Sequence, residues 1–557
     1  MTAPRDFQPA PQDLQGTRQA ASLLLLRDSP AGPEVLMLRR AERADDLRSG
    51  VWVFPGGVLD PVDVRLHARV TGADDAALSE DMGLAAGALD YVVAAIRESF
   101  EEVGVLLAGP GEAAQRAAQE RDGCITGADF EALCQRHDLQ LQGDALVYYS
   151  HWLTPPGIPK RFDTRFFVAR MPGGQAAVAD RGEAQEVAWF TPAAALESEL
   201  KLLPVTRRTL MDLARAPDVD SVLDLARRQP PERCMMPRLG LGPKGVRPVL
   251  PDEWAWAEIG RLDPTGQGDV ALDLQPLRAV PLSPRVTRLT CANGSVMTGP
   301  GTNTYLVRSP GSMEVAVIDP GPDDAHTEAH LQAVLAAAAP GRITRIFVTH
   351  THKDHSPAAQ RLRALTGAPV IGRVADHPEW QDATMQPDHV PANGEWFELG
   401  PDAHLQAVAT PGHASNHVCW LLPQEQLLFT GDHVMQGSTV VINPPDGDMG
   451  AYFRSLEAML ALDLDWLAPG HGFLMPEPHA EVHRLLAHRR VREAKVMAAL
   501  AAIGPATAEQ LVPEVYGDVP VARHALAARS LTAHLLKLAA EGRAVRGDAE
   551  AIWQVVA

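Results

Sequence analysis

The chain has 557 residues, of which 46% are hydrophobic, as expected of a globular protein long enough for two to four domains. Fifty lysines and arginines stand against 70 aspartates and glutamates, and this net charge of −20 excludes a surface that attracts nucleic acid without sequence preference. No run approaches the roughly 20 apolar residues of a membrane helix. Five cysteines without paired spacing indicate a reducing compartment, so we expect a cytoplasmic protein without membrane contacts.

The N-terminal region begins with a polar, proline-containing stretch, residues 1–17, which we expect to be flexible. An apolar run from Ala20 to Leu26 predicts the first strand. A further strand, around Trp52, ends in the glycine turn Gly56-Gly57. These features open the first domain, which we place at residues 18–260.

An acidic cluster follows in the same domain. Glu98, Glu101 and Glu102 are spaced i, i+3, i+4, so a helix places the three carboxylates on one face. Like charges on one face repel unless a cation lies among them, and hard oxygen ligands in this number suit Mg²⁺ or Mn²⁺. The other interpretation is a solvated acidic face, which most charge runs are. The glycine turn and the apolar opposite face favour metal binding.

These residues resemble the Nudix box. The resemblance implies a Nudix α/β/α sandwich that hydrolyses a diphosphate joined to another moiety. It also implies that Glu101 and Glu102 bind the metal, that Glu98 is a further ligand or the general base, and that Arg97 orients the glutamates.

Two departures from the box stand out. Asp63 occupies the place of the first glutamate, and a segment from about Arg65 to Tyr91 is inserted before the helix, which we expect to be a surface excursion. An insert there, with the segment Lys160 to Phe167, resembles the Nudix hydrolases that cleave the diphosphate of coenzyme A and its esters. The implied substrate is coenzyme-A-like or nucleoside-diphosphate-linked. A non-catalytic, nucleotide-binding regulator is the alternative.

The first domain ends in an extension. Leu210 to Arg228 predicts two short helices with Asp218 as the cap between them. A stretch rich in glycine and proline predicts a linker over residues 261–283. We therefore place a second domain at residues 284–476 and a third at residues 477–557.

The second domain contains a loop rich in metal ligands. It follows Ile343 to Val348, an apolar, β-branched run that predicts a buried strand. Imidazole and carboxylate are ligands that zinc takes in open catalytic sites. Because residues two apart in extended chain point the same way, His350 and His352 can share one ion, with Asp354 and His355 turned toward a neighbouring one.

Three further residues of this kind lie downstream. His413 lies on a turn, and Asp432 and His471 each follow a strand-like run. Each comes from the end of a separate strand, which suits a site on one rim of a sheet. A single histidine of this kind is more often a core or surface residue, but the ordered set predicts a dinuclear metal site.

The order and types of these residues resemble the metallo-β-lactamase-fold hydrolases. Within that group, Gly301 to Val307 and Val317 to Gly321 resemble the glyoxalase-II-like and lactamase-β-like endoribonuclease branch. The resemblance implies an αβ/βα sandwich and two zinc ions. The first zinc would be held by His350, His352 and His413, the second by Asp354, His355 and His471, with Asp432 bridging both. The commonest zinc β-lactamases carry cysteine in place of Asp432, so lactam hydrolysis is not expected.

The chemistry at this site follows from the ions. Zinc activates water for attack on an electrophile. We expect Asp354 to steer that water and Asp319 to orient a ligand histidine. A thioester or related ester and a phosphodiester both remain open, since the same ions stabilise either developing charge. Small-molecule substrates are favoured, and RNA is less favoured because of the acidic chain. Both halves acting on coenzyme-A-like compounds is a third hypothesis.

The tail, residues 477–557, predicts three helices and a hairpin. The helices are expected at about 479–503, 508–516 and 521–541, with the basic cluster His488 to Arg492 facing away from the apolar side of the first. The tail resembles the winged helix appended to the lactamase-β-like endoribonucleases. It could contact RNA, shape the mouth of the metal site or form a dimer contact. The expected fold class is α/β and α+β multidomain.

Overall fold

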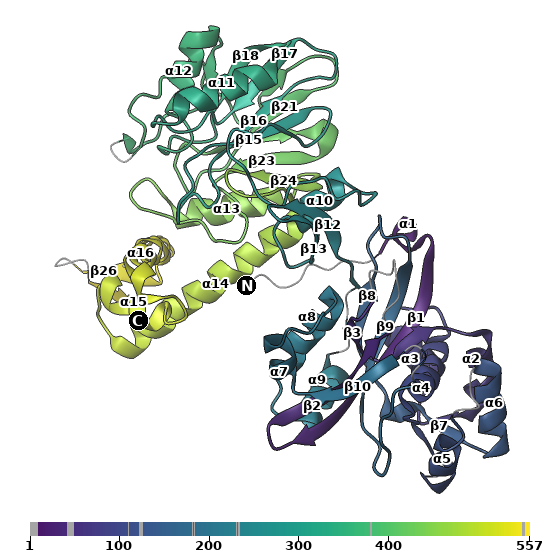
Figure 1. Cartoon of the computed structure of the whole chain (residues 1–557). Coiled ribbons are helices and arrows are strands. Elements are labelled where there is room, and N and C mark those ends of the chain that lie inside the picture. Colours follow the sequence, from purple (N-terminus) through teal and green to yellow (C-terminus); the bar gives the residue numbers. More distant parts are fainter. Residues whose placement is uncertain are drawn as a thin grey trace. The chain divides into compact units, whose positions relative to one another are not determined.

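The chain divides into two compact units. The computed structural model describes residues 9–41, 49–109, 111–121, 126–180, 182, 184–229, 231, 234–378, 381–547 and 552–556. The N-terminal unit holds residues 3–253 and 263–269, and the C-terminal unit holds residues 254–262 and 270–557 (Figure 1). The sequence places residues 254–260 in the first domain, but the structure groups residues 254–262 with the C-terminal unit. The other domain limits stay predictions.

Part of the predicted flexible N-terminus, residues 1–8, lies outside the described residues, as does Cys124. Residues 9–17 include the short helix α1 (Pro11–Leu14) and the first residue of β1. None of the helices in the described part of the chain combines the length and the apolarity needed to cross a membrane.

The N-terminal unit is built on an eight-stranded sheet in the order β10-β2-β1-β9-β8-β11, with β3 paired to β2 and β4 to β1. The strands are β1 (Thr17–Ser29), β2 (Gly32–Arg40), β3 (Trp52–Val53), β4 (Gly56–Val58), β8 (Val147–Leu153), β9 (Arg161–Arg170), β10 (Ala184–Phe190) and β11 (Cys234–Met235). A small sheet joins β5 (Val70–Thr71), β7 (Gln140–Gln142) and β6 (Ala108–Gly109), and a hairpin joins β12 (Arg238–Gly242) and β13 (Gly245–Val249).

Helices cover both faces of this sheet. Besides α1, the α-helices of the unit are α2 (Pro61–Arg65), α3 (Asp75–Asp81), α4 (Ala88–Val103), α5 (Gly111–Ala118), α6 (Gly127–Arg136), α7 (Pro192–Glu197), α8 (Pro204–Leu213) and α9 (Val219–Arg228). Alternate residues of β1 explain the two layers: Leu23 packs with Phe100 of α4, and Leu24 packs with Leu210 of α8. The predicted α/β/α sandwich is confirmed.

Two local predictions have different outcomes. Asp218 caps α9 by accepting a hydrogen bond from the backbone N–H of Ser221 at 2.7 Å, as expected. The insert is not only a surface excursion, because Leu66 and Met82 are buried in the core beside α4.

The C-terminal unit contains two six-stranded sheets. The first has the order β14 (Val280–Pro281), β15 (Val286–Thr290), β16 (Asn303–Val307), β17 (Glu314–Ile318), β18 (Arg342–Phe347) and β19 (Val370–Ile371). The second has the order β20 (Trp396–Glu398), β21 (His404–Ala409), β22 (Val418–Leu422), β23 (Leu427–Gly431), β24 (Trp466–Pro469) and β25 (Met475–Pro476).

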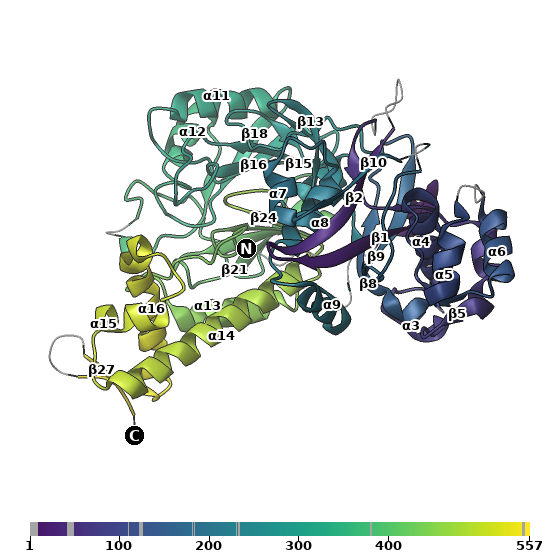
Figure 2. The same cartoon turned by 60° about the horizontal axis from the view of Figure 1, so that its bottom comes forward.

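These sheets stack face to face, and helices cover their outer faces. The covering helices are α11 (Thr327–Ala338), α12 (Ala358–Thr366) and α13 (Met449–Met459), whereas the short helix α10 (Trp256–Leu262) packs against the central core through Leu262. Tyr305 and Phe347 of the first sheet pack with Trp420 and Phe429 of the second to form the central core. Figure 2 shows α11 and α12 on one outer side and α13 on the other. The αβ/βα sandwich predicted from the sequence is therefore confirmed.

Helix α10 is tied into this sandwich by a buried ion pair. Both carboxylate oxygens of Glu258 accept hydrogen bonds from Arg288 of β15, at 2.6 and 2.8 Å. Glu258 also accepts the backbone N–H of Leu474 at 2.8 Å. The two charged side chains are 3% and 2% exposed. Because a buried charge needs a partner, this pair fixes α10 against the strand.

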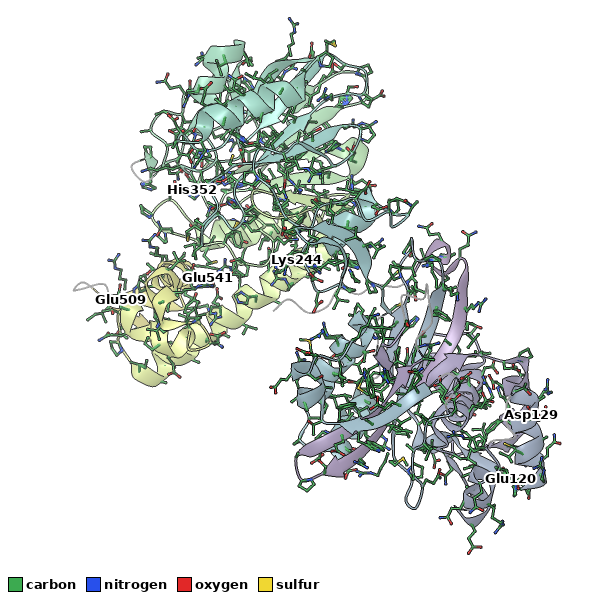
Figure 3. All side chains as sticks on the ribbon, viewed as in Figure 1. Glu120, Asp129, Lys244, His352, Glu509 and Glu541 are labelled. Atoms are coloured by element: carbon green, nitrogen blue, oxygen red, sulfur yellow. The ribbon has the colours of Figure 1, made fainter. Side chains whose placement is uncertain are left out.

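The tail forms the three helices and hairpin expected of a winged helix. Its elements are α14 (Pro478–Ile503), α15 (Ala508–Val515), α16 (His524–Ala540), β26 (Ala544–Arg546) and β27 (Trp553–Val555). Glu509 and Glu541 mark it in Figure 3. The basic cluster was predicted to face away from the core, and this is wrong for Arg489 and Arg492, which are buried. Arg492 pairs with Asp518 at 2.7 Å, whereas Arg490 is exposed.

Candidate functional site

The seven predicted zinc ligands lie where strands of the C-terminal unit end. They come from four segments, which explains why they are scattered in the sequence. His350, His352, Asp354 and His355 follow β18, His413 follows β21, Asp432 follows β23, and His471 follows β24. Figure 3 marks the position of His352.

Four of these residues form a first donor group. His350, His352, His413 and Asp432 each bring one donor atom to within 4.8 Å of the others. Nδ1 of His352 lies 3.0 Å from Nε2 of His350 and 3.0 Å from Nε2 of His413. Nitrogens about 2.0–2.1 Å from a tetrahedral zinc stand about 3.3 Å apart, so this spacing suits donors around one ion.

The second donor group shares Asp432 with the first. It comprises Asp354, His355, Asp432 and His471. Nε2 of His471 lies 3.3 Å from Oδ2 of Asp354 and 3.3 Å from Oδ1 of Asp432. Nε2 of His355 lies 3.3 Å from the same Oδ1. Oδ2 of Asp432 is directed to the other group, 3.8 Å from Nε2 of His413. One carboxylate therefore faces both groups.

The opposite ring nitrogens of these histidines are held by acceptors. Nδ1 of His413 donates to the carbonyl of Val441 at 2.7 Å, and Nδ1 of His471 donates to that of Gly301 at 3.2 Å. Nδ1 of His355 donates to Asp319 at 2.9 Å, as expected of Asp319. A proton on Nδ1 leaves the lone pair of Nε2 directed into the site, which is the arrangement that metal ligation requires.

The charges of the site also suit divalent cations. Burial lowers the pKa of His352 to about 3 and that of His350 well below its usual value, so both rings are neutral donors. Burial opposes a charge on His471, but the carboxylates of Asp432 and Asp354 outweigh it and raise its pKa to about 9. The two carboxylates thus attract positive charge, and bound metal would supply it.

Three atoms facing the site lack the partners that burial normally demands. Nε2 of His355, Nε2 of His471 and Oδ1 of Asp432 are buried without a well-aligned hydrogen bond in the described part of the chain. Orphaned donors and acceptors of this kind are satisfied when they ligate a cation. The residues present therefore fit a pair of metal ions.

Several residues that support the site were not identified as such from the sequence. Asn303 donates through its side chain to the carbonyls of Pro469 and Gly472, on either side of His471, at 3.1 and 2.9 Å. Thr349 donates its hydroxyl to Asp319 at 2.7 Å. Thr349 and the backbone carbonyls that accept these hydrogen bonds are not residue types or groups that indicate a metal site in a sequence. Only the fold brings them to the site.

The Nudix-like residues gather around Arg97 in the N-terminal unit. Its guanidinium donates to Glu98 at 2.8 Å, to Glu101 at 3.2 Å and to the buried Asp63 at 2.9 Å. Asp63, the departure from the box, is therefore the partner that holds this arginine. Among the described residues, the glutamates of α4 do not form a compact donor group of three, and Arg97 lies between two of them.

The glycine turn lies against these glutamates. The backbone N–H of Gly56 donates to Glu102 at 2.8 Å. A Cβ on Gly57 would lie 2.4 Å from the carboxylate of Glu98, so any larger residue there would displace that carboxylate. Burial and the charge of Glu98 raise the pKa of Glu101 to about 7, although Arg97 opposes this shift. A carboxyl group with so high a pKa is one that a metal ion would ionise.

Three family models match separate parts of the chain. The metallo-beta-lactamase superfamily matches residues 297–471, and the beta-lactamase associated winged helix domain matches residues 507–553. The NUDT19 Nudix domain matches residues 74–202. A NUDIX hydrolase from Alicyclobacillus acidocaldarius is 27% identical, with a TM-score of 0.32, over 37% of this chain and 96% of that one.

Two curated relatives are similar over about half of this chain. An atrochrysone carboxyl ACP thioesterase from Aspergillus fumigatus is 32% identical over 43% of this chain and 76% of its own length. A beta-lactamase-like protein 2 homolog from Drosophila melanogaster is 33% identical over 47% of this chain and 92% of its own length. The chain therefore belongs to the metallo-beta-lactamase superfamily and is a hydrolase that also carries a Nudix domain and a winged helix.

Proposed function

We propose that the C-terminal site is a dinuclear zinc centre that hydrolyses thioesters or related esters. The observation that carries this proposal is the pair of donor groups joined by Asp432. One zinc would be held by His350, His352 and His413, the other by Asp354, His355 and His471. Bound zinc acidifies a coordinated water and polarises the carbonyl that is attacked.

Asp354 has the position of a residue that handles the attacking water. Its side chain is 27% exposed, compared with 11% for Asp432 and 7% for His471, so it lies on the side that a substrate reaches. Its carboxylate can accept a hydrogen bond from the water and hold it toward the carbonyl. His350, His355, Asp432 and His471 are buried and fix the geometry.

An apolar loop beside the site supports an acyl substrate. Val296 and Met297 are 87% and 60% exposed at the tip of a turn closed by the bridge between Ser295 and Gly299. The same loop leads to Gly301, whose carbonyl holds His471. An exposed apolar tip suits the hydrocarbon part of a thioester better than a polyanion. The thioesterase named among the relatives supports the same substrate class.

The test is a substrate panel on the full-length protein loaded with zinc. Acyl-coenzyme A, acyl-glutathione and single-stranded RNA are compared in the parent and in Asp432→Asn. The proposal expects thioester hydrolysis that chelation and Asp432→Asn both abolish. Zinc-bound parent protein that leaves every thioester intact would contradict it. RNA cleavage would favour the alternative, a zinc-dependent endoribonuclease that uses the winged helix to bind RNA. Arg489 and Arg492 of that helix count against this alternative, because they bind groups of the protein itself.

For the N-terminal unit we propose Mg²⁺- or Mn²⁺-dependent hydrolysis of a diphosphate in a coenzyme-A-like or nucleoside-diphosphate-linked substrate. Glu101 and Glu102 would bind the metal, and Glu98 would be a further ligand or the base. Arg97 supports this by holding Glu98 and Glu101 in place.

The double variant Glu101→Gln, Glu102→Gln tests the Nudix proposal. Loss of diphosphate hydrolysis with unchanged thioester turnover indicates two independent enzymes. If the parent protein has no diphosphatase activity and the double variant changes thioester turnover, the N-terminal unit is instead a nucleotide-binding regulator.

A further inference from the structure

One loop of the C-terminal unit, residues 440–448, runs beside the ligand His413. The carbonyl of Val441 accepts the hydrogen bond from Nδ1 of His413 at 2.7 Å. At the other end of the loop, Asp446 accepts the backbone N–H of Ser415 at 3.1 Å, two residues after the ligand. The position and tautomer of His413 therefore depend on where this loop lies.

The tail holds the loop on both sides of Val441. Arg489 of α14 donates from its guanidinium to the carbonyl of Val440. The backbone N–H of Ile442 donates to the hydroxyl of Ser530, in α16, at 3.4 Å. Arg489 and Ser530 are 2% and 6% exposed, so neither contact competes with water. The tail thus binds the peptide group that carries the acceptor of His413, through the N–H of Ile442, and the peptide group before it, through the carbonyl of Val440.

A second route joins the same arginine to the ligands. The guanidinium of Arg489 lies 5.4 Å from the ring centre of Tyr452, in α13. The hydroxyl of Tyr452 donates to the carbonyl of His433, the residue after Asp432, at 3.0 Å. The backbone of Tyr452 also lies so close to Gly412 that a Cβ there would be 2.5 Å from the tyrosine Cα. Arg489 therefore supports the neighbours of two ligands.

We propose that Arg489 is a positioning residue for His413, and that the winged-helix tail thereby sets the metal affinity of the catalytic site. The inference rests on the proposed metal centre and deepens it. Without the arginine, the Val440 carbonyl loses its charged donor, and of the two tail contacts only the one between Ile442 and Ser530 remains to hold the Val441 carbonyl toward Nδ1. Losing such an outer partner typically costs about 10-fold to 100-fold in metal affinity.

The experiment compares Arg489→Gln with Arg490→Gln in the full-length protein. Both variants remove one arginine from neighbouring positions of α14, but Arg490 is exposed and pairs with Glu457 at the surface, at 3.1 Å. Zinc affinity is measured by chelator competition, and the absorption spectrum of the cobalt-substituted protein reports on ligand geometry. We expect about 10-fold to 100-fold weaker binding of one ion and an altered spectrum in Arg489→Gln only.

Ser530→Ala provides the same test with a smaller change, in case Arg489→Gln does not fold. It should weaken the same ion and leave the second unchanged. The inference would be overturned if Ser530→Ala, and Arg489→Gln where it folds, had the same zinc affinities and cobalt spectra as Arg490→Gln. A parent protein that binds no pair of zinc ions would instead overturn the proposed metal centre, so the two failures are distinguishable.

Discussion

Breaking the buried pair between Glu258 and Arg288 should destabilise the C-terminal unit more than any surface ion pair does. Glu258→Gln keeps the shape of the side chain but leaves Arg288, 2% exposed, without its countercharge. Removing one partner of a buried pair costs about 3–5 kcal/mol. At about 2–4 °C per kcal/mol for a unit of this size, the unfolding midpoint should fall by roughly 6–20 °C.

Differential scanning calorimetry of the full-length protein measures this shift, and two further variants make it specific. Glu328→Gln removes an exposed partner of Arg361, at 2.8 Å, while Asp323 still pairs with that arginine, and should cost less than about 1 kcal/mol. The double variant Glu258→Met, Arg288→Met removes both buried charges and should recover part of the loss. If the unfolding midpoint of Glu258→Gln equals that of Glu328→Gln, the reasoning that α10 belongs to the core of this unit is refuted.

Three other outcomes follow from the two sites. Asp432→Asn should lower zinc binding at both positions, because its two oxygens face different donor groups, and loss of a single ion by metal analysis would contradict this. Since the pKa of Glu101 is raised to about 7, Mg²⁺ affinity of the N-terminal unit should rise as the pH passes through about 7, and a flat titration by calorimetry would count against Glu101 as a ligand. Val296→Ser with Met297→Ser should raise KM for long-chain acyl thioesters more than for acetyl thioesters, and equal effects would remove the loop from substrate binding.

The sequence predicts those parts of the protein whose function follows from the types and spacing of nearby residues. Three histidines and an aspartate in one short loop indicate a metal centre before any fold is known, and the spacing of Glu98, Glu101 and Glu102 indicates one helix face. The layers of both sandwiches follow from the alternation of apolar residues in strands such as β1.

Other features depend on contacts between distant segments and have no local pattern. The carbonyl of Val441 could be supplied by any residue type, so nothing in the sequence indicates that it holds His413. Arg489 belongs to a basic run that predicts a solvated helix face, yet the fold buries it. Glu258 lies in a segment that the sequence places at the end of the first domain. Its ion pair with Arg288, which only the fold shows, assigns it to the second domain.

The chain passes from the N-terminal unit to the C-terminal unit at residue 254, returns at 263 and leaves again at 270. A single cut therefore cannot yield two complete halves. A protease acting just after α10 would strip the hydrolase of that helix, and one acting just before α10 would strip the Nudix unit of residues 263–269.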